Sequence, residues 1–224
     1  ASLPYMNKLL LIMVALLLAS VVYLLNKQPN MVNATVKSID STLIKKELAA
    51  AREAEMALAR LHNFSNQLQT FAAQNRYATD VAFLIDMSLP SGKKRFFVYD
   101  LQADTVMHSG LVAHGSCNQR FLKKGQFSNT VNSGCTSTGK YKVGYSYNGN
   151  FGKAYKLFGL DSTNSKAFER FVVLHGYSCV PDNETYPQPI CNSLGCPMVS
   201  YAFLANLENI IDNSRRPILL WIYQ

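Results

Sequence analysis

The sequence has few charged residues, few glycines and prolines, and no cysteine pair with the spacing of a metal site. Charged residues make up 16% of the 224 residues and hydrophobic ones 48%, which excludes an intrinsically disordered chain. The 12 Gly and 8 Pro follow no period, so collagen-like and low-complexity architectures are excluded as well. The length allows one well-buried domain with extensions, or two small domains.

The number of cysteines is odd, because the chain has five of them. No C-x2-C pair occurs among these residues, so we expect no metal site. In an oxidising compartment at least one cysteine would stay unpaired within the chain. Two interpretations remain: every cysteine is structural, or one is a nucleophile with a histidine base.

An almost wholly apolar run covers residues 9–25. Its length is at the lower limit for a membrane-spanning helix. Residues 23–25 are Tyr-Leu-Leu, which crowds the place of a small-x-small cleavage site. We therefore assign residues 1–30 to an uncleaved signal anchor in preference to a cleaved signal peptide. Both interpretations export the rest of the chain, and the anchor predicts membrane contact through this helix.

The composition changes to helix formers between Ser38 and about Gln74, a segment without Gly or Pro. Apolar residues recur there at steps near three, four and seven: Leu48, Ala51, Leu58, Leu61, Leu68 and Phe71. Polar residues interrupt any strict heptad, so residues 31–77 are predicted to form a helical linker or stalk. We place the domain boundary near residue 78.

Residues 78–224 alternate short β-branched and aromatic segments with turn residues. The predicted strands cover residues 83–89, 94–101, 105–115, 139–144, 156–160, 171–176 and 218–223. Ser200 is predicted to cap a late helix over residues 201–211. Short strands at this spacing indicate a mainly β domain, a β-sandwich or a barrel-like sheet.

Two short segments could carry nucleophilic chemistry. His175 ends an apolar strand and is followed by Gly176, which leaves the imidazole uncrowded. The sequence Ser193-Leu194-Gly195-Cys196-Pro197 places a sulfur in a tight turn shortly before the late helix. Its glycine permits a positive φ, and the neighbouring N–H groups can face an oxyanion. A helix N-terminus and an imidazolium nearby would both favour the thiolate.

The region from Phe83 to the C-terminus resembles the bacterial murein L,D-transpeptidase catalytic domain. The resemblance rests on four motifs in consistent order: Val112-Ala113-His114-Gly115, Ser133-Gly134-Cys135-Thr136-Ser137-Thr138-Gly139, the strand ending in His175-Gly176, and Ser193-Leu194-Gly195-Cys196-Pro197. They are closest to a subgroup with Ser-x-Gly-Cys-Pro around the nucleophile. Leu194 stands where the more familiar family motif has a histidine.

The resemblance implies a mainly β L,D-transpeptidase fold over residues 78–224, with no cofactor. Cys196 is the implied nucleophile and His175 the implied general base. The expected oxyanion and positioning residues are Gly195, Ser193 and Gly176.

Two further residues are candidates for substrate contact. His114 matches a histidine of the subgroup's first motif, but a structural hydrogen bond is the favoured alternative for it. Tyr141 is more simply a strand residue, although it could border the cleft.

The implied substrate is the stem tetrapeptide of peptidoglycan. Cys196 would form an acyl-enzyme with release of the terminal D-Ala, and transfer to an amine of a second stem would give a 3→3 cross-link. Water as the acceptor would make the protein an L,D-carboxypeptidase. A function of another class is a catalytically silent, membrane-anchored wall-binding module. The resemblance also implies acylation by carbapenems.

The formal net charge is +8, from 22 Lys and Arg against 14 Asp and Glu. The basic residues are scattered and no nucleic-acid motif accompanies them, so we expect no nucleic-acid partner. Attraction to anionic wall polymer or membrane headgroups is the simpler interpretation. The expected location is the bacterial periplasm or the wall face of the inner membrane.

Cys196 is the sulfur that we expect to stay free. The other four cysteines permit three pairings. We predict that Cys179 pairs with Cys191 and that Cys117 pairs with Cys135.

Overall fold

The computed structural model describes residues 20, 22–24 and 41–224. The chain divides into two compact units, Ala1–Ala54 and Glu55–Gln224. The predicted signal anchor over residues 1–30 lies outside the described residues apart from 20 and 22–24, so it stays a prediction. Among the described residues, no helix has both the length and the apolar character that a membrane crossing requires.

The segment of helix formers is one long helix, α3 (Ser41–Asn75). In the second unit, the buried side chains of α3 lie at helical steps and include Leu61, Leu68 and Ala72. They pack on β-strand residues such as Leu84 in a hydrophobic cluster. Leu58, which we placed on the same apolar stripe, is 66% exposed. Within the second unit, α3 contacts the sheet from Arg60 onward, where its guanidinium donates to Asp86 of β1 at 2.8 Å.

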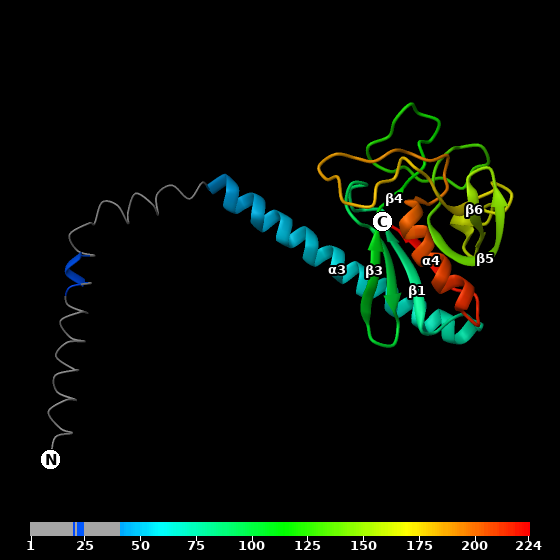
Figure 1. The fold of residues 1–224 in the computed structure, drawn as a ribbon, viewed down its shortest axis with the longest axis horizontal. Helices are drawn as coiled ribbons and strands as arrows, with labels where there is room; N and C mark the ends of the chain where they lie inside the picture. Colours follow the sequence, from blue (N-terminus) through cyan, green and yellow to red (C-terminus); the bar gives the residue numbers. More distant parts are fainter. Residues whose placement is uncertain (1–19, 21, 25–40) are drawn as a thin grey trace, which may run out of the picture. The chain divides into compact units, whose positions relative to one another are not determined.

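One nine-stranded sheet occupies the second unit, in the order β3-β2-β1-β9-β5-β6-β7-β8-β4. Its strands are β1 (Val81–Asp86), β2 (Phe96–Asp100), β3 (Thr105–Gly110), β4 (Val112–Ala113), β5 (Gly139–Gly149), β6 (Gly152–Gly159), β7 (Val173–Gly176), β8 (Met198–Val199) and β9 (Leu219–Tyr223). The sheet curls into a nearly closed, barrel-like form, so the barrel-like prediction is confirmed and a two-sheet sandwich is not observed (Figure 1).

The late helix is α4 (Tyr201–Asn213), and its cap is the predicted one. Ser200 Oγ accepts a hydrogen bond from the Phe203 N–H at 3.1 Å, which satisfies one of the free donors of the first turn. The apolar face of α4 buries Leu204 and Leu207 in the main core. In Figure 1, α4 lies between β1 on one side and β5 and β6 on the other.

The last strand, β9, is central in the sheet because it pairs with β1 in parallel and with β5 antiparallel. Leu220 and Ile222 point into the main core, whereas Leu219 and Tyr223 point to the α3 side. With both faces covered, the strand needs an almost continuous apolar sequence. The same apolar sequence is the pattern from which the strand over residues 218–223 was predicted.

The two-residue strand β8 was not predicted, because two residues carry no periodicity. It pairs with β7 in parallel and with β4 antiparallel. This strand begins two residues after Cys196, so the sheet fixes the position of the cysteine turn.

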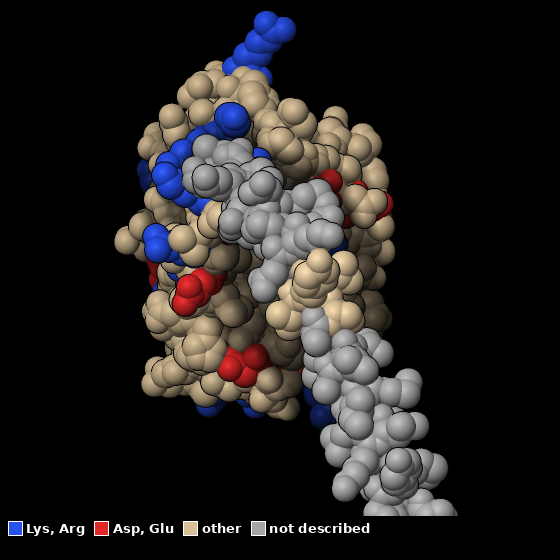
Figure 2. All heavy atoms as spheres, turned by 90° about the vertical axis from the view of Figure 1, so that its left-hand side faces the viewer, with Lys and Arg blue, Asp and Glu red and all other residues tan. Residues whose placement is uncertain are grey.

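Charged side chains of both signs are visible on the face shown in Figure 2. Basic side chains lie mostly in the upper half of that face, and acidic ones are spread among uncharged residues. This distribution agrees with the scattered basic residues of the sequence.

Candidate active site

The turn that carries Cys196 is closed by the side chain of Ser193. Ser193 Oγ accepts a hydrogen bond from the Gly195 N–H at 3.1 Å and donates one to the Cys196 carbonyl at 2.7 Å. Gly195 has φ +116°, and a Cβ placed there would lie 2.7 Å from the Cys135 carbonyl oxygen. The turn therefore needs glycine both for its backbone angle and for its close approach to Cys135.

Two of the sequence motifs, residues 112–115 and 133–139, form hydrogen bonds that hold this turn in place. Ser193 pairs with Gly115 in a parallel bridge, its N–H donates to the His114 carbonyl at 2.9 Å and its carbonyl accepts from the Ser116 N–H at 2.8 Å. The Gly115 N–H donates to Thr136 Oγ1 at 2.9 Å. Motifs that lie about 80 and about 60 residues upstream thus position the cysteine turn, as expected for a site assembled by tertiary contacts.

Cys196 is the one cysteine outside a disulfide. Its Sγ accepts a hydrogen bond from the Val173 N–H at 3.4 Å and lies 3.8 Å from the Phe171 carbonyl, to which the thiol donates. Burial raises the pKa of the thiol, while the Val173 N–H and the charges of Arg170 and Lys156 lower it. The thiol is therefore held as a neutral group close to two cations that favour its thiolate.

His175 lies in β7, opposite Ala154 of β6 and Met198 of β8. Its Nδ1 lies 3.0 Å from the Gly176 carbonyl, so Nδ1 carries the proton and Nε2 keeps its lone pair. Burial lowers the pKa of the imidazole, with the Gly176 bond acting in the opposite direction. Phe151 stacks on the ring, with centroids 5.0 Å apart. The result is a neutral imidazole with a free basic nitrogen.

Cys196 and His175 line the same cavity, of about 600 Å³. They also share a neighbouring hollow of about 300 Å³. The larger cavity is lined by Ser116, Gln119, Arg120, Phe121, Phe151, His175, Tyr177, Cys191, Asn192, Ser193, Leu194, Cys196 and Met198. The hydrogen bonds of the Cys196 thiol go to the backbone of Phe171 and Val173, two residues that line the smaller hollow.

The backbone N–H of Cys196 points to no acceptor of its own turn. It has no hydrogen-bond acceptor within the described part of the chain, whereas the Gly195 N–H is already bound by Ser193 Oγ. In this arrangement Ser193 positions the turn. Gly176 accepts the bond from His175 and packs against Tyr201, where a Cβ would meet the ring at 2.6 Å.

Arg170 was missed by the sequence reasoning. Its guanidinium donates to the Ser128 carbonyl at 2.7 Å and to the Cys135 carbonyl, and it lies beneath Gly195. It thereby joins the loop before β5 to the cysteine turn and places a positive charge near Cys196. No local signal could have found it, because its backbone partners are 35 and 42 residues away.

His114 is hydrogen-bonded inside the protein, which is the alternative that the sequence favoured over substrate contact. It is fully buried, and burial together with the Arg95 charge lowers its pKa to about 4. Arg95 Nη2 donates to its Nδ1 at 2.9 Å, and its Nε2–H donates to the Leu122 carbonyl at 2.9 Å. Every polar atom of the ring is used inside the protein, so none faces a substrate.

Tyr141 is also removed from the list of substrate contacts. Its side chain is fully buried, and its hydroxyl donates to the Ser137 carbonyl at 2.7 Å. Burial raises the pKa of this phenol to about 12. Tyr141 therefore fastens the start of β5 to the loop that precedes it.

Two disulfides join the four remaining cysteines, Cys117 to Cys135 and Cys179 to Cys191. This is the pairing expected from the sequence. The first closes the loop that carries Arg170's carbonyl partners, and Cys191 of the second lines the larger cavity. Disulfides of this kind are typical of an oxidising compartment.

Residues 52–223 match the family of the L,D-transpeptidase catalytic domain. This match covers most of the chain, and the protein belongs to that family. A comparison with curated protein sequences finds no match.

Several solved structures match about two thirds of this chain, all at low sequence identity. They include an L,D-transpeptidase from Xylanimonas cellulosilytica (15% identity, TM-score 0.37, 66% of this chain and 62% of that one) and the Ldtfm-avibactam carbamoyl enzyme (11%, 0.41, 65% and 49%). A third is the helical cell shape determining protein Pgp2 from Campylobacter jejuni (11%, 0.40, 64% and 47%). The chain thus spans between about half and three fifths of these chains.

Proposed function

We propose that this protein is an exported cysteine L,D-transpeptidase that acts on peptidoglycan stem tetrapeptides. Membership of the L,D-transpeptidase catalytic domain family supports the reaction class. One observation carries the assignment of residues: the single free cysteine, Cys196, and a neutral imidazole, His175, line one cavity. A thiol and a basic nitrogen facing the same space are the minimum needed for acyl transfer.

The first half of the reaction forms a thioester. The Cys196 thiol turns from the Phe171 carbonyl toward the imidazole and gives its proton to His175 Nε2. The thiolate then attacks the carbonyl carbon between the third residue and the terminal D-Ala, and the Cys196 N–H donates to the oxyanion. The C–N bond breaks, His175 returns the proton to the departing amine, and D-Ala leaves.

The second half transfers the acyl group. The side-chain amine of a second stem attacks the thioester while His175 Nε2 takes a proton from it. The C–S bond breaks, the thiolate is reprotonated by His175, and a 3→3 cross-link forms. The energy of the original peptide bond is retained in the thioester, so no ATP is needed outside the membrane.

Export to the periplasm is part of this proposal. The two disulfides support it, because they are favoured in oxidising compartments. The apolar run over residues 9–25 supports it from the sequence. We propose that this run anchors the catalytic unit to the membrane through the segment that precedes that unit.

The test is incubation with defined tetrapeptide stems, with cross-linked dimer and trimmed tripeptide quantified together. We expect dimer from the unaltered chain and neither product from Cys196→Ala. His175→Ala should lose about 100- to 10,000-fold in rate, the usual contribution of a general base. His108→Ala is the matched control, because it removes an exposed imidazole outside the cavity.

Each outcome has one meaning. Tripeptide without dimer would replace the transpeptidase by an L,D-carboxypeptidase. Undiminished product from Cys196→Ala would refute the assigned nucleophile. No product from the folded, unaltered chain would favour the silent wall-binding module.

A further inference from the structure

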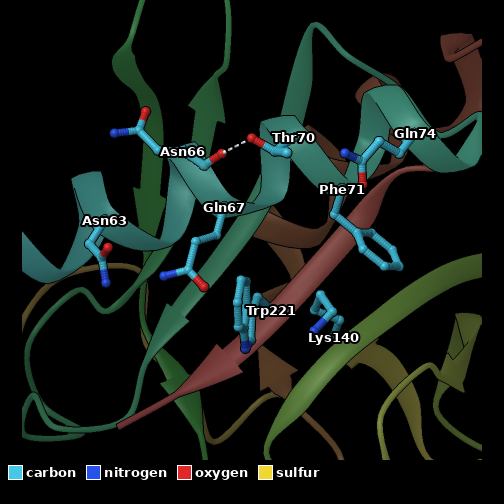
Figure 3. Close-up of a pocket in the computed structure, with 8 residues that line it drawn as sticks. All are labelled: Asn63, Asn66, Gln67, Thr70, Phe71, Gln74, Lys140 and Trp221. Carbon is cyan, nitrogen blue, oxygen red and sulfur yellow. Dashed lines mark hydrogen bonds between the residues drawn. The ribbon is translucent and has the colours of Figure 1, made fainter.

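A second groove lies on the α3 side of the sheet and shares no residue with the Cys196 cavity. Its volume is about 460 Å³. It is lined by Asn63, Asn66, Gln67, Thr70, Phe71, Gln74, Lys140 and Trp221 (Figure 3). Nothing in the proposed acyl-transfer reaction uses these residues.

The floor of the groove is an aromatic platform that includes Trp221 and Phe71. The rings of Phe64 and Trp221 meet edge to face, with centroids 4.7 Å apart and an interplanar angle of 75°. Lys140 Nζ lies 4.6 Å from the centre of the Trp221 ring and 5.4 Å from that of Phe71. Because Lys140 is paired with Asp161 at 2.8 Å, its charge is already compensated. The platform is therefore rigid and close to neutral before any ligand arrives.

The rim of the groove is formed by amide side chains on α3. Asn63, Gln67 and Gln74 are exposed, and their side-chain amides form no hydrogen bond within the described residues. Figure 3 shows Gln67 extending from α3 toward Trp221. An amide offers two donors and one acceptor, so this rim can bind hydroxyl and acetamido groups alike.

A second hollow, of about 480 Å³, lies beside this groove. Trp221 lines both hollows, and Asp161 and Thr163 lie on the far side. A surface with an aromatic residue at its centre and polar groups on both sides fits a chain of repeated units. It is open along its length rather than closed around one small molecule.

We propose that this groove binds a chain of N-acetylated amino sugars. A sugar ring has an apolar C–H face, which can stack on Trp221, and a rim of hydroxyl and acetamido groups, which can bond to the amides of α3. The compensated charge of Lys140 favours a neutral polymer over a phosphate or a carboxylate.

The identification of this chain with the glycan strand that carries the stem peptides rests on the proposed function. A protein that holds the strand at one face and its peptides at another raises the effective concentration of the peptides at Cys196. The groove would thus favour stems attached to a strand over free stems.

The chain contains a single tryptophan, so its fluorescence reports on this groove alone. The Cys196→Ala protein is titrated with N-acetylglucosamine hexamer and with glycan strands stripped of peptides. We expect a saturable shift of the emission to shorter wavelength, because stacking shields the indole from water. Free tetrapeptide stems should give no shift.

Two variants of one residue type separate the groove from a general effect of α3. Gln67→Ala should weaken sugar binding about three- to tenfold, the loss expected for one neutral hydrogen bond. Gln69→Ala removes a hydrogen bond of the same helix to the Leu101 carbonyl, outside the groove, and should bind as the parent does. Equal binding by both variants would overturn the proposal, as would an emission that sugars leave unchanged or that only peptides shift.

The rates on sugar-free stems separate the two proposals. With the catalytic Cys196 restored, Gln67→Ala should keep the parent rate on free stems and lose its advantage on stems attached to strands. Sugar binding without any reaction on stems would refute the proposed function, while the proposal that the groove binds sugars would stand. Reaction on stems without sugar binding would refute the groove alone.

Discussion

The substitution Gly195→Ala tests whether the close contact between the cysteine turn and Cys135 sets the position of the nucleophile. Gly195 has φ +116°, and an added Cβ would lie 2.7 Å from the Cys135 carbonyl oxygen and 3.2 Å from an Arg170 nitrogen. Both neighbours are fixed, because Arg170 itself donates to the Cys135 carbonyl. The turn must therefore move, by a good part of an ångström.

The magnitude follows from these two effects. A side chain in this region of backbone angles costs about 1–3 kcal/mol, and the contact adds to it. We expect the free energy of unfolding to fall by about 3 kcal/mol, which lowers the Tm of a domain of this size by roughly 6–12 °C. The displaced thiol should reduce the rate on tetrapeptide stems about 100-fold.

Gly152→Ala separates backbone strain from contact in the unfolding measurement. Gly152 also has a positive φ, +82°, but no atom lies within 4 Å of an added Cβ. It should therefore lose only about 1–2 kcal/mol. Urea unfolding and stem turnover are measured on both variants. A Gly195→Ala protein no less stable than Gly152→Ala, with a rate within threefold of the parent, would refute the reasoning.

Three further predictions concern buried and charged groups. His114 is buried neutral with a pKa of about 4, below the ordinary 6.5, so the unfolded chain takes up the proton first. The contribution of neutral His114 to the free energy of unfolding is complete above about pH 6.5 and is lost as the pH falls toward 4, by up to about 3 kcal/mol. The His114→Asn variant should be less stable at pH 7, and its urea unfolding should lack most of this pH dependence. Arg170 lowers the pKa of the Cys196 thiol, so Arg170→Met should shift the pH profile of Cys196 alkylation to higher pH while Arg170→Lys shifts it less; coincident profiles would contradict this electrostatic role. A carbapenem, a strained acyl donor, should add once to the unaltered chain and not to Cys196→Ala in intact-mass spectrometry, and an adduct on both would place the reactive group elsewhere.

Much of the fold was accessible from local sequence pattern. Segments that are apolar on both faces, such as residues 218–223, predicted buried strands. Ser200 predicted the N-cap of α4. The two-residue strand β8 and the exposure of Leu58 were not accessible. They depend on where distant strands come to lie, and α3 is covered only where the sheet reaches it.

The candidate site divides in the same way. The Ser-Leu-Gly-Cys-Pro turn and the His175-Gly176 strand end were visible because their chemistry is local. For His114 and Tyr141 the sequence left substrate contact open beside the favoured structural role, since residue type and motif position do not reveal burial. Arg170 was invisible, because its three partners come from a loop more than 30 residues away.

By itself, the sequence determined that one sulfur of five would be left over and that Cys196, in a glycine turn before a helix, was the best choice. Counting and turn chemistry are local properties, and they need no coordinates. Only the tertiary structure decided how that sulfur is held: its thiol bonds to Val173, its turn rests on Cys135 and Gly115, and His175 shares its cavity. It also decided that the single tryptophan would lie in a separate groove. These are contacts between distant segments, which packing creates and no single segment records.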